Sequence, residues 1–376
     1  MTVYMDHAAT SFVKEEALQA MLPYLREQFG NPSSLHGEGL AAKRAMQTAR
    51  EQLSVILGCS MNELYFTSGG TEADNWAIKG YLQASPEKGR HIITSAIEHP
   101  AVLRTCEFLQ RNGYSLTVLP VDGNGIVTPE SVRAAIRPDT ALISIQYANN
   151  EIGTIEPIAE IGTIAEERGI AFHTDAVQAV GQLPIKLSEL PVTMLSASGH
   201  KFGGPKGVGF LYVRSGTKLE PLLHGGPQEK RRRAGTENVP SIIAMSKALS
   251  LSEAVDWDRI RRLRDEMETR LKEKIPDILV NGHPTSRLPG SLSVSIKGVE
   301  ATSVLVYLDL AGIAASGGSA CSSAENKPSA VLSAIGVTEP YLSGTVRFTL
   351  GEDNTMQEVE YVVDTLAETV KKLRRY

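Results

Sequence analysis

Two residues with complementary chemistry each stand at the end of an apolar run. Lys201 follows the run "TMLSAS", and Asp175 closes the run "IAFHTD". Ligands of open α/β sheets bind at the carboxyl ends of strands, so both side chains are expected at one site. A lysine amine can form a Schiff base with a carbonyl cofactor, and an aspartate can keep a pyridine nitrogen protonated. A solvated lysine and a helix-capping aspartate are the ordinary alternatives, but the pair is typical of pyridoxal phosphate chemistry.

The segment "FTSGGTEADN" predicts a site for a phosphate. It has the pattern of a strand, a turn of small residues and a helix that begins near Gly70 and Thr71. Free backbone N–H groups and the helix dipole favour an anion at such a helix start, although a Thr-x-x-Asp cap has the same pattern. The chain has no Walker P-loop and no G-x-G-x-x-G after its first strand, so a nucleotide is less favoured than a simple phosphate ligand.

Further polar residues follow or interrupt other apolar runs. His99 comes after "HIITSAIE" and suits stacking on a planar cofactor, whereas a lone histidine there would be structural. Asn149 and Asn150 follow "ALISIQYA", where they offer amide contacts or form a turn. Arg347 is a charge inside the apolar run "TVRFTL", where it pairs with an acid or forks onto a substrate carboxylate. Each of these residues alone is weak evidence for a binding site, but several strand ends that supply complementary parts of one site are much stronger evidence.

Only one of the three cysteines stands in a setting that permits thiol reactivity. Cys321 lies in "SGGSACSSAEN", among small residues. Cys106 falls in helical register with Val102 and Leu109, which indicates burial, and Cys59 has the position of a turn residue after a helix end. The chain has no Cys-x-x-Cys pair, so we expect neither a metal site nor a disulfide framework.

The composition is that of an ordinary soluble globular protein. Hydrophobic residues make up 42% and charged residues 22%, and the net charge is -5, so no direct contact with nucleic acid is expected. The basic run 230–233 is interpreted as a solvated loop near the phosphate site. No apolar stretch is long enough to span a bilayer, and the N-terminus lacks the features of a signal peptide. The cytoplasm is therefore the expected location.

Short β-type runs alternate with helical patterns through most of the chain. The predicted strands are 63–68, 91–95, 115–120, 141–146, 170–174, 193–198 and 208–213. Several are apolar throughout, as in a sheet that helices cover on both faces. Among the helical patterns, one places Met46, Ala49, Leu53 and Ile56 on one stripe and ends at Gly58. The alternation predicts an α/β fold with a mostly parallel sheet.

The pattern changes near residue 240. The stretch 241–275 is predicted to be one long helical segment, after which strands mix with helices. We expect a large domain over residues 12–256. We expect a smaller α+β domain over 1–11 and 257–376, which carries Cys321.

The quoted residues lie in motifs that together resemble one family. The motifs are "DHAATS", "FGNPSSLH", "FTSGGTEADN", "EHPAVL", "NNEIGT", "HTDAVQ", "SGHKFGGPKG", "RRAGTENVP", "SGGSACSS" and "VRFTLG". Nearly end to end, the chain resembles the NifS/IscS-type cysteine desulfurases, which have the aspartate-aminotransferase fold (pyridoxal phosphate fold type I). The long segment around Cys321 is similar to the NifS/IscS branch rather than the SufS branch. The resemblance implies removal of sulfur from L-cysteine, which gives L-alanine and a persulfide on Cys321.

The resemblance also implies which residues hold the cofactor, pyridoxal 5'-phosphate. Lys201 would be the Schiff-base lysine and proton shuttle, Asp175 would pair with the ring nitrogen, and Gln178 with the ring hydroxyl. His99 would stack on the ring and assist proton transfer. The phosphate would be held by Gly70, Thr71, Ser198 and His200, and by Thr236 of the partner subunit in a homodimer.

For the substrate, the resemblance implies a carboxylate site made by Asn150 and Arg347, with Asn31 nearby; Asn150 would also contact the cofactor. Cys321 would accept the sulfur and pass it to an acceptor protein in iron–sulfur cluster assembly or tRNA thiolation. Two features depart from the family. The chain ends at "LAETVKKLRRY", without the extension that some IscS-type members use in scaffold docking, and Glu352 stands where several relatives have Arg or Pro.

Three other functions stay open at this point. A selenocysteine lyase of the same fold would have similar residues. An aminotransferase would not need Cys321. A catalytically silent scaffold protein would be expected to lack Lys201 or Cys321, and both are present.

Overall fold

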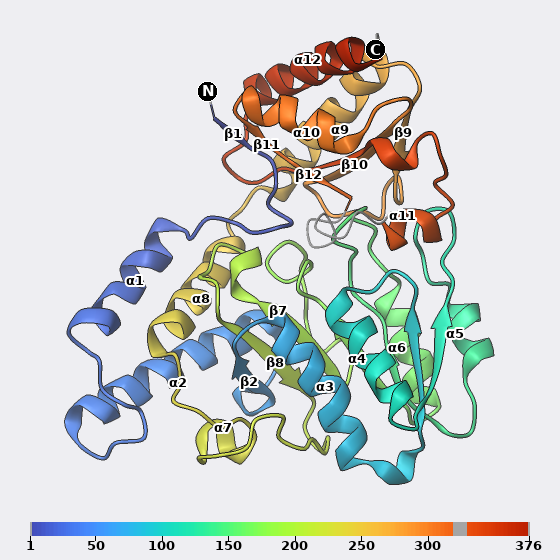
Figure 1. The fold of residues 1–376 in the computed structure, drawn as a ribbon. Coiled ribbons are helices and arrows are strands. Elements are labelled where there is room, and N and C mark those ends of the chain that lie inside the picture. Colours follow the sequence, from blue (N-terminus) through green and yellow to red (C-terminus); the bar gives the residue numbers. More distant parts are fainter. Residues whose placement is uncertain (1, 319–328, 375–376) are drawn as a thin grey trace.

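The computed structural model describes residues 2–318 and 329–374, which form a large unit and a smaller one above it (Figure 1). The large unit is built on a seven-stranded sheet of order β2-β8-β7-β6-β5-β3-β4. Its strands are β2 (Leu64–Thr67), β3 (His91–Ser95), β4 (Ser115–Leu119), β5 (Thr140–Ser144), β6 (Ala171–Asp175), β7 (Met194–Ser198) and β8 (Gly209–Val213). All seven predicted strands form, and β3 to β7 run parallel, whereas β8 is antiparallel to both β2 and β7.

Helices cover both faces of this sheet, which explains why several of its strands have apolar residues at successive positions. On β5, Leu142 packs into a cluster with α3 (Gly70–Ala84) and α4 (Pro100–Arg111). The next residue, Ile143, packs into the cluster on the opposite face. The helices of that face include α2 (Gly37–Leu57), α5 (Pro129–Ala135), α6 (Ile158–Glu167) and α8 (Val239–Ser252). Successive side chains of a strand point to opposite faces, so both must be apolar.

The smaller unit is an antiparallel sheet covered by helices. Its strand order is β12-β13-β10-β9, with β9 (Ile278–Asn281), β10 (Ser291–Ile296), β12 (Ser316–Gly317) and β13 (Thr345–Thr349). The helices are α9 (Trp257–Lys274), α10 (Ala301–Leu310), α11 (Ala330–Ala334) and α12 (Met356–Leu373). From the other end of the chain, β1 (Val3–Tyr4) pairs with β11 (Ile313–Ala314). The predicted fold class is confirmed, while the boundaries 12–256 and 257–376 stay a prediction.

The prediction of one long helix over 241–275 is wrong. The segment forms two helices, α8 and α9, because the chain turns at 253–256 and starts again. The side chain of Asp256 accepts a hydrogen bond from the backbone N–H of Arg259 at 2.8 Å, as an N-cap residue does. The break lets α8 pack on the large sheet and α9 on the small one.

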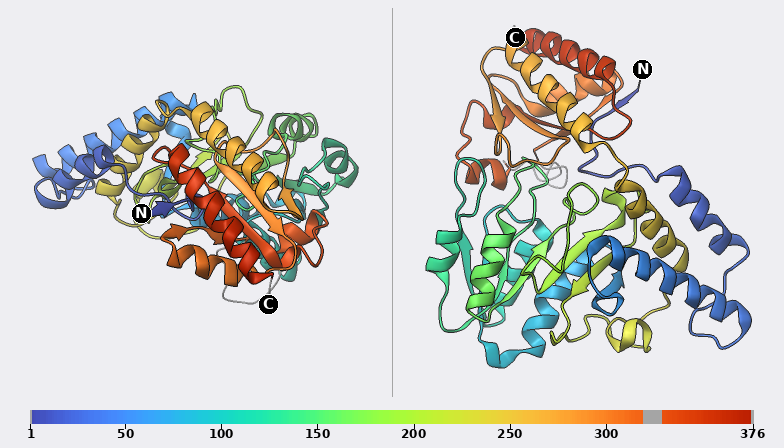
Figure 2. Two further views of the ribbon diagram at one scale, coloured as in Figure 1. Left: turned by 90° about the horizontal axis from the view of Figure 1, so that it is seen from above. Right: turned by 180° about the vertical axis from the view of Figure 1, so that it is seen from behind.

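An arm of two helices extends from the large unit. Figure 2 shows α1 (Glu15–Arg26) and the start of α2 projecting beyond the sheet. The two remaining helical segments of interest are η3 (Gly199–Lys201), directly after β7, and α7 (Gln228–Arg231). Among the residues that the structure describes, we find no helix with the length and apolar character needed to cross a membrane.

Candidate active site

The parallel strands bring three predicted residues to one edge of the large sheet. Asp175 ends β6, Lys201 follows β7 in η3, and His99 is the N-cap of α4, which follows β3. A carboxylate oxygen of Asp175 and a ring nitrogen of His99 lie within 4.8 Å of each other. The three groups also interact electrostatically, since Lys201 acts on the pKa of both His99 and Asp175.

The side chain of Lys201 is held by the N-terminal segment of the chain. Its Nζ donates to the backbone carbonyl oxygens of Ala8 at 2.5 Å and of Ala9 at 2.9 Å. Gln178 Nε2 donates to the same Ala8 oxygen at 3.0 Å, so Gln178 and Lys201 meet at one backbone group. His200 is tied to this segment as well, because its Nδ1 lies 3.1 Å from Oγ1 of Thr10.

Burial shifts the pKa values of Asp175 and His99 in opposite directions. Burial raises the pKa of Asp175, and His99 and Lys201 act against that rise. The carboxylate accepts a hydrogen bond from the backbone N–H of Val177 at 2.9 Å, which favours its ionised form. Burial lowers the pKa of His99. Its Nδ1 accepts from the N–H of Ala101 at 3.1 Å, so the neutral ring carries its proton on Nε2.

The start of α3 fits a phosphate group. Its N-cap, Gly69, has φ +148° and supplies no side-chain cap, whereas the neighbouring α4 has a capping side chain. A Cβ at Gly70 would lie 2.5 Å from Cγ2 of Val177, so only glycine fits there. Ser198, at the end of β7, flanks Gly69. The backbone N–H groups of the first turn are therefore available to an anion.

Arg347 lies on β13 of the smaller unit and is only 1% exposed. Its Nη1 donates to the backbone oxygen of Asn150 at 2.9 Å, and its Nη2 donates to Oδ1 of Asp6 at 2.8 Å. Within the described part of the chain, its Nε has no hydrogen-bond partner. The structure thus brings Arg347 and Asn150 together. Asp6 is a residue that the sequence reasoning missed, although the motif "DHAATS" contains it.

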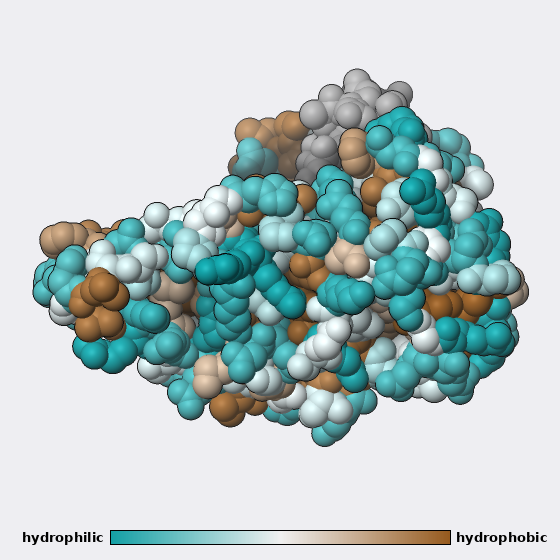
Figure 3. All heavy atoms as spheres, turned by 90° about the horizontal axis from the view of Figure 1, so that it is seen from below, coloured by the Kyte–Doolittle hydropathy of each residue, from teal (hydrophilic) through white to brown (hydrophobic). Residues whose placement is uncertain are grey.

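Two predicted residues lie away from this group. Asn31 is exposed between α1 and α2, where its Oδ1 accepts from the N–H of Ser33. Thr236 is exposed in the loop between α7 and α8, and Figure 1 places α7 at the end of the large unit farthest from the smaller one. Apolar side chains are exposed on the arm near Asn31, as the left side of Figure 3 shows; they include Phe29 and Leu35, which are 77% and 91% exposed.

Cys321 lies outside the described residues, but residues before and after its segment are described. Ser329 Oγ donates to Oε2 of Glu151 at 2.5 Å, and Gly318 packs near the same carboxyl oxygen. Glu151 directly follows Asn150 on the large unit, and burial raises its pKa to about 7. Both stems of the cysteine segment therefore contact the loop that carries Asn150, a contact that the sequence did not reveal.

The other two cysteines are poor nucleophiles. Burial raises the pKa of Cys59 and of Cys106 to about 12, and Cys106 is fully buried in α4. Since the thiolate is the reactive form, neither side chain is reactive at neutral pH.

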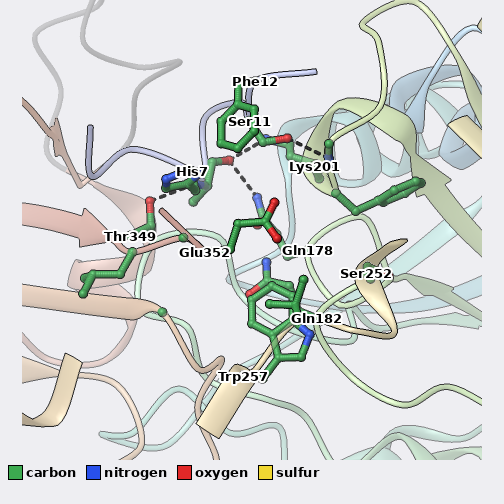
Figure 4. A pocket seen from close by; sticks show the side chains of 18 of the residues that line it. His7, Ser11, Phe12, Gln178, Gln182, Lys201, Ser252, Trp257, Thr349 and Glu352 are labelled. Carbon is green, nitrogen blue, oxygen red and sulfur yellow. Dashed lines mark hydrogen bonds between the residues drawn. The ribbon is translucent and has the colours of Figure 1, made fainter. Parts of the chain in front are cut away.

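A cavity of about 60 Å³ lies between the two units, beside Lys201 (Figure 4). His7, Gln178, Trp257 and Glu352 are among its lining residues. Glu352 has a partner in the structure. Its carboxylate pairs with Nζ of Lys14 at 2.7 Å, and both residues line the cavity between the two units.

Comparison with known proteins places these residues in a family. Residues 3–362 match the family model described as aminotransferase class-V. A protein named cysteine desulfurase IscS from Methanosarcina thermophila is 52% identical over 375 residues, 99% of this chain and 93% of that protein. Another of that name, from Dictyoglomus turgidum, is 50% identical over 376 residues, 99% of this chain and 95% of that protein.

Solved structures agree with this placement. A NifS-like protein superposes with a TM-score of 0.93 at 36% identity, covering 99% of this chain and 100% of that one. A structure described as SspA in complex with cysteine has a TM-score of 0.85 at 37% identity, covering 94% of this chain and 100% of that one. The chain belongs to the class-V aminotransferase family and, within it, to the cysteine desulfurases, which confirms the resemblance seen in the sequence.

Proposed function

We propose that this protein is a pyridoxal phosphate-dependent cysteine desulfurase that takes sulfur from L-cysteine, releases L-alanine and holds the sulfur as a persulfide on Cys321. The observation that carries the proposal is the convergence of Lys201, Asp175 and His99 beside the uncapped start of α3. Family membership gives these groups their chemistry.

The residues at the sheet edge would hold the cofactor from several sides. When bound, pyridoxal phosphate supplies an aldehyde carbon and a ring that accepts the electron pair from the substrate. Lys201 would hold the aldehyde carbon through Nζ, and its amine would take the proton from the substrate Cα. Asp175 would hold the proton on the ring nitrogen, Gln178 would bind the ring hydroxyl, and His99 would stack on the ring. Gly70, Thr71, Ser198 and His200 would hold the phosphate.

Arg347 and Asn150 would bind the carboxylate of L-cysteine. Hydrogen bonds to Asp6 and to the Asn150 carbonyl hold the Arg347 side chain in place. Its Nε has no acceptor among the described residues and is therefore available to a ligand. A fixed guanidinium binds a planar carboxylate with little loss of side-chain entropy. The proposed role of Asn31 would need a second copy of the chain, since Asn31 lies on the projecting arm.

The sulfur step uses Cys321 as a nucleophile. Its thiolate attacks the sulfur of the substrate, the C–S bond breaks, and the electron pair of that bond goes to the substrate carbon, which is then protonated. The sum is L-cysteine plus the Cys321 thiol giving L-alanine plus the Cys321 persulfide. An acceptor protein, an iron–sulfur scaffold or a tRNA thiolase in the cytoplasm, would then take the outer sulfur.

The protein loaded with pyridoxal phosphate should convert L-cysteine and a thiol reductant into L-alanine and sulfide in equal amounts. The measurement is amino-acid analysis beside a sulfide assay, with L-selenocysteine in a parallel reaction. Turnover of L-selenocysteine alone would identify a selenocysteine lyase instead. Transfer of the amino group to a keto acid would identify an aminotransferase.

We also propose that the enzyme is a homodimer in which Thr236 reaches the phosphate bound by the other subunit. The loop before Thr236 has an unusual backbone conformation, because Glu229, Lys230 and Arg231 all have positive φ values. Glu229 is buried, and it accepts from Arg50 at 2.5 and 2.9 Å and from the Phe66 N–H at 2.9 Å. Residues at positive φ persist only where the surrounding structure holds them.

Replacing Thr236 by alanine should raise the dissociation constant of pyridoxal phosphate about ten- to a hundredfold, the value of one hydrogen bond to a charged group. Equilibrium dialysis of the apo-protein measures this, and Thr338→Ala, on the smaller unit, is the matched control. A fully active monomer, found by light scattering under assay conditions, would contradict the shared site.

A further inference from the structure

A second carboxyl group lies beneath the cofactor site without a role in the proposed reaction. Asp74 stands in α3 and is only 1% exposed. One of its oxygens lies within 4.8 Å of both the Asp175 carboxylate and a ring nitrogen of His99. Among the described residues, its Oδ1 has no hydrogen-bond partner. A buried, unpaired carboxylate is strongly destabilising, so this arrangement needs a physical explanation.

Asp74 belongs to a buried polar network between the central strands. The Ser196 side chain acts to lower the pKa of the Asp74 carboxyl group, and Oγ of Ser196 lies 2.9 Å from Nε2 of His173. Nδ1 of His173 lies 2.8 Å from Oγ of Ser144 on β5. Burial lowers the pKa of His173 to about 3, so this ring is neutral at physiological pH. Although Nε2 of His173 is 3.6 Å from Oδ1 of Asp74, the ring supplies no positive charge.

The groups that face Asp74 oppose a negative charge on it. Burial raises the pKa of Asp74 well above its usual value, and the nearby acids Asp175 and Glu98 raise it further. Asp175 differs, because Lys201 and the backbone N–H of Val177 both favour its ionised form. Two carboxyl groups this close do not both ionise. The pair therefore carries one charge, and the surroundings assign it to Asp175.

We propose that Asp74 is a positioning residue of the cofactor site, an inference that rests on the proposed function: Asp74 stays a neutral carboxylic acid beside Ser196 and His173, so that the one negative charge of the Asp74–Asp175 pair stays on Asp175. A neutral acid has one O–H donor and acceptor capacity, and an asparagine side chain reproduces both. A second charge here would compete with Asp175 for the proton of the ring nitrogen.

The first test compares Asp74→Asn with Asp74→Ala. The apo-proteins are titrated with pyridoxal phosphate at several pH values across the neutral range, and the dissociation constants are compared. Asp74→Asn should keep the affinity of the parent protein and its pH dependence. Asp74→Ala should bind about tenfold more weakly, because the variant lacks both the donor and the acceptor of a neutral acid beside Asp175. If Asp74→Asn binds as weakly as Asp74→Ala, or if its pH dependence shifts, Asp74 acts as a carboxylate and the proposal is wrong.

Glu156→Gln is the matched control for these variants. Glu156 is also a buried carboxyl whose pKa burial raises, to about 8, and its Oε1 also lacks a partner among the described residues. It accepts from the N–H of Val127, and it is not among the groups that act on Asp175. This variant should bind pyridoxal phosphate as the parent does.

The second test reads the protonation state of Asp74 without the cofactor. The infrared difference spectrum between the apo-parent and apo-Asp74→Asn should show the carbonyl stretch of a protonated carboxylic acid, which shifts in heavy water. A carboxylate band in its place would overturn the proposal, even if Asp74→Ala fails to fold. Failure of the parent protein to bind pyridoxal phosphate would refute the proposed function, and the infrared result would still stand.

Discussion

Cys321→Ser should bind pyridoxal phosphate normally and still change the absorbance of the cofactor when L-cysteine is added, but release almost no alanine. The steps before sulfur removal use Lys201, Asp175 and the cofactor, not the thiol. A serine hydroxyl is neither ionised nor thiophilic at neutral pH. We expect the rate of alanine release to fall at least about a thousandfold, which corresponds to about 4 kcal/mol of barrier. A steady-state assay measures alanine release, and an absorbance titration measures cofactor binding and the response to L-cysteine.

The other two thiols provide the controls. Cys59→Ser and Cys106→Ser should leave the persulfide on Cys321, because burial raises the pKa of Cys59 and of Cys106 to about 12 in the parent protein. Alkylation followed by peptide mapping locates the persulfide. Normal turnover by Cys321→Ser, or a persulfide found on Cys59 or Cys106, would show that the proposed sulfur step is wrong.

Lys201→Ala should lose turnover almost completely. The side chain would both bind the cofactor covalently and move the Cα proton, and loss of the proton transfer alone costs about a hundred- to ten-thousandfold. In the parent protein, borohydride reduction followed by mass spectrometry should find the cofactor on Lys201. Reduced cofactor on a different lysine would contradict the assignment.

Lys206→Ala is the matched control for this variant. Lys206 lies five positions along the same glycine-rich turn and is exposed, whereas Lys201 is partly buried and held by the carbonyl groups of Ala8 and Ala9. The control variant should keep its turnover and its covalent cofactor, which separates loss of one particular amine from general damage to the turn.

The sequence was informative about the strands because their apolar residues face two helical layers. Leu142 and Ile143 are neighbours on β5 and pack into opposite clusters, so both of these successive positions had to be apolar. The break between α8 and α9 was harder to predict. Each of the residues 253–256 is compatible with a helix. The start of α9 is marked by the Asp256 side chain, which accepts a hydrogen bond from the backbone N–H of Arg259, and this bond is seen only in the structure.

By itself, the sequence determined the chemistry that is available at the sheet edge. Lys201, Asp175 and His99 follow β-type runs, and parallel strands necessarily bring their carboxyl ends to one edge. The family resemblance rested on the same motifs.

Only the tertiary structure decided which distant residues meet and which of them are charged. Asp6 and Arg347 are far apart in the chain, and they pair because the N-terminal segment folds back along β13. Asp74 and Asp175 have the same carboxyl group. Their charges differ because a carboxyl group ionises according to its burial and the charges around it, and both are set by packing rather than by residue type.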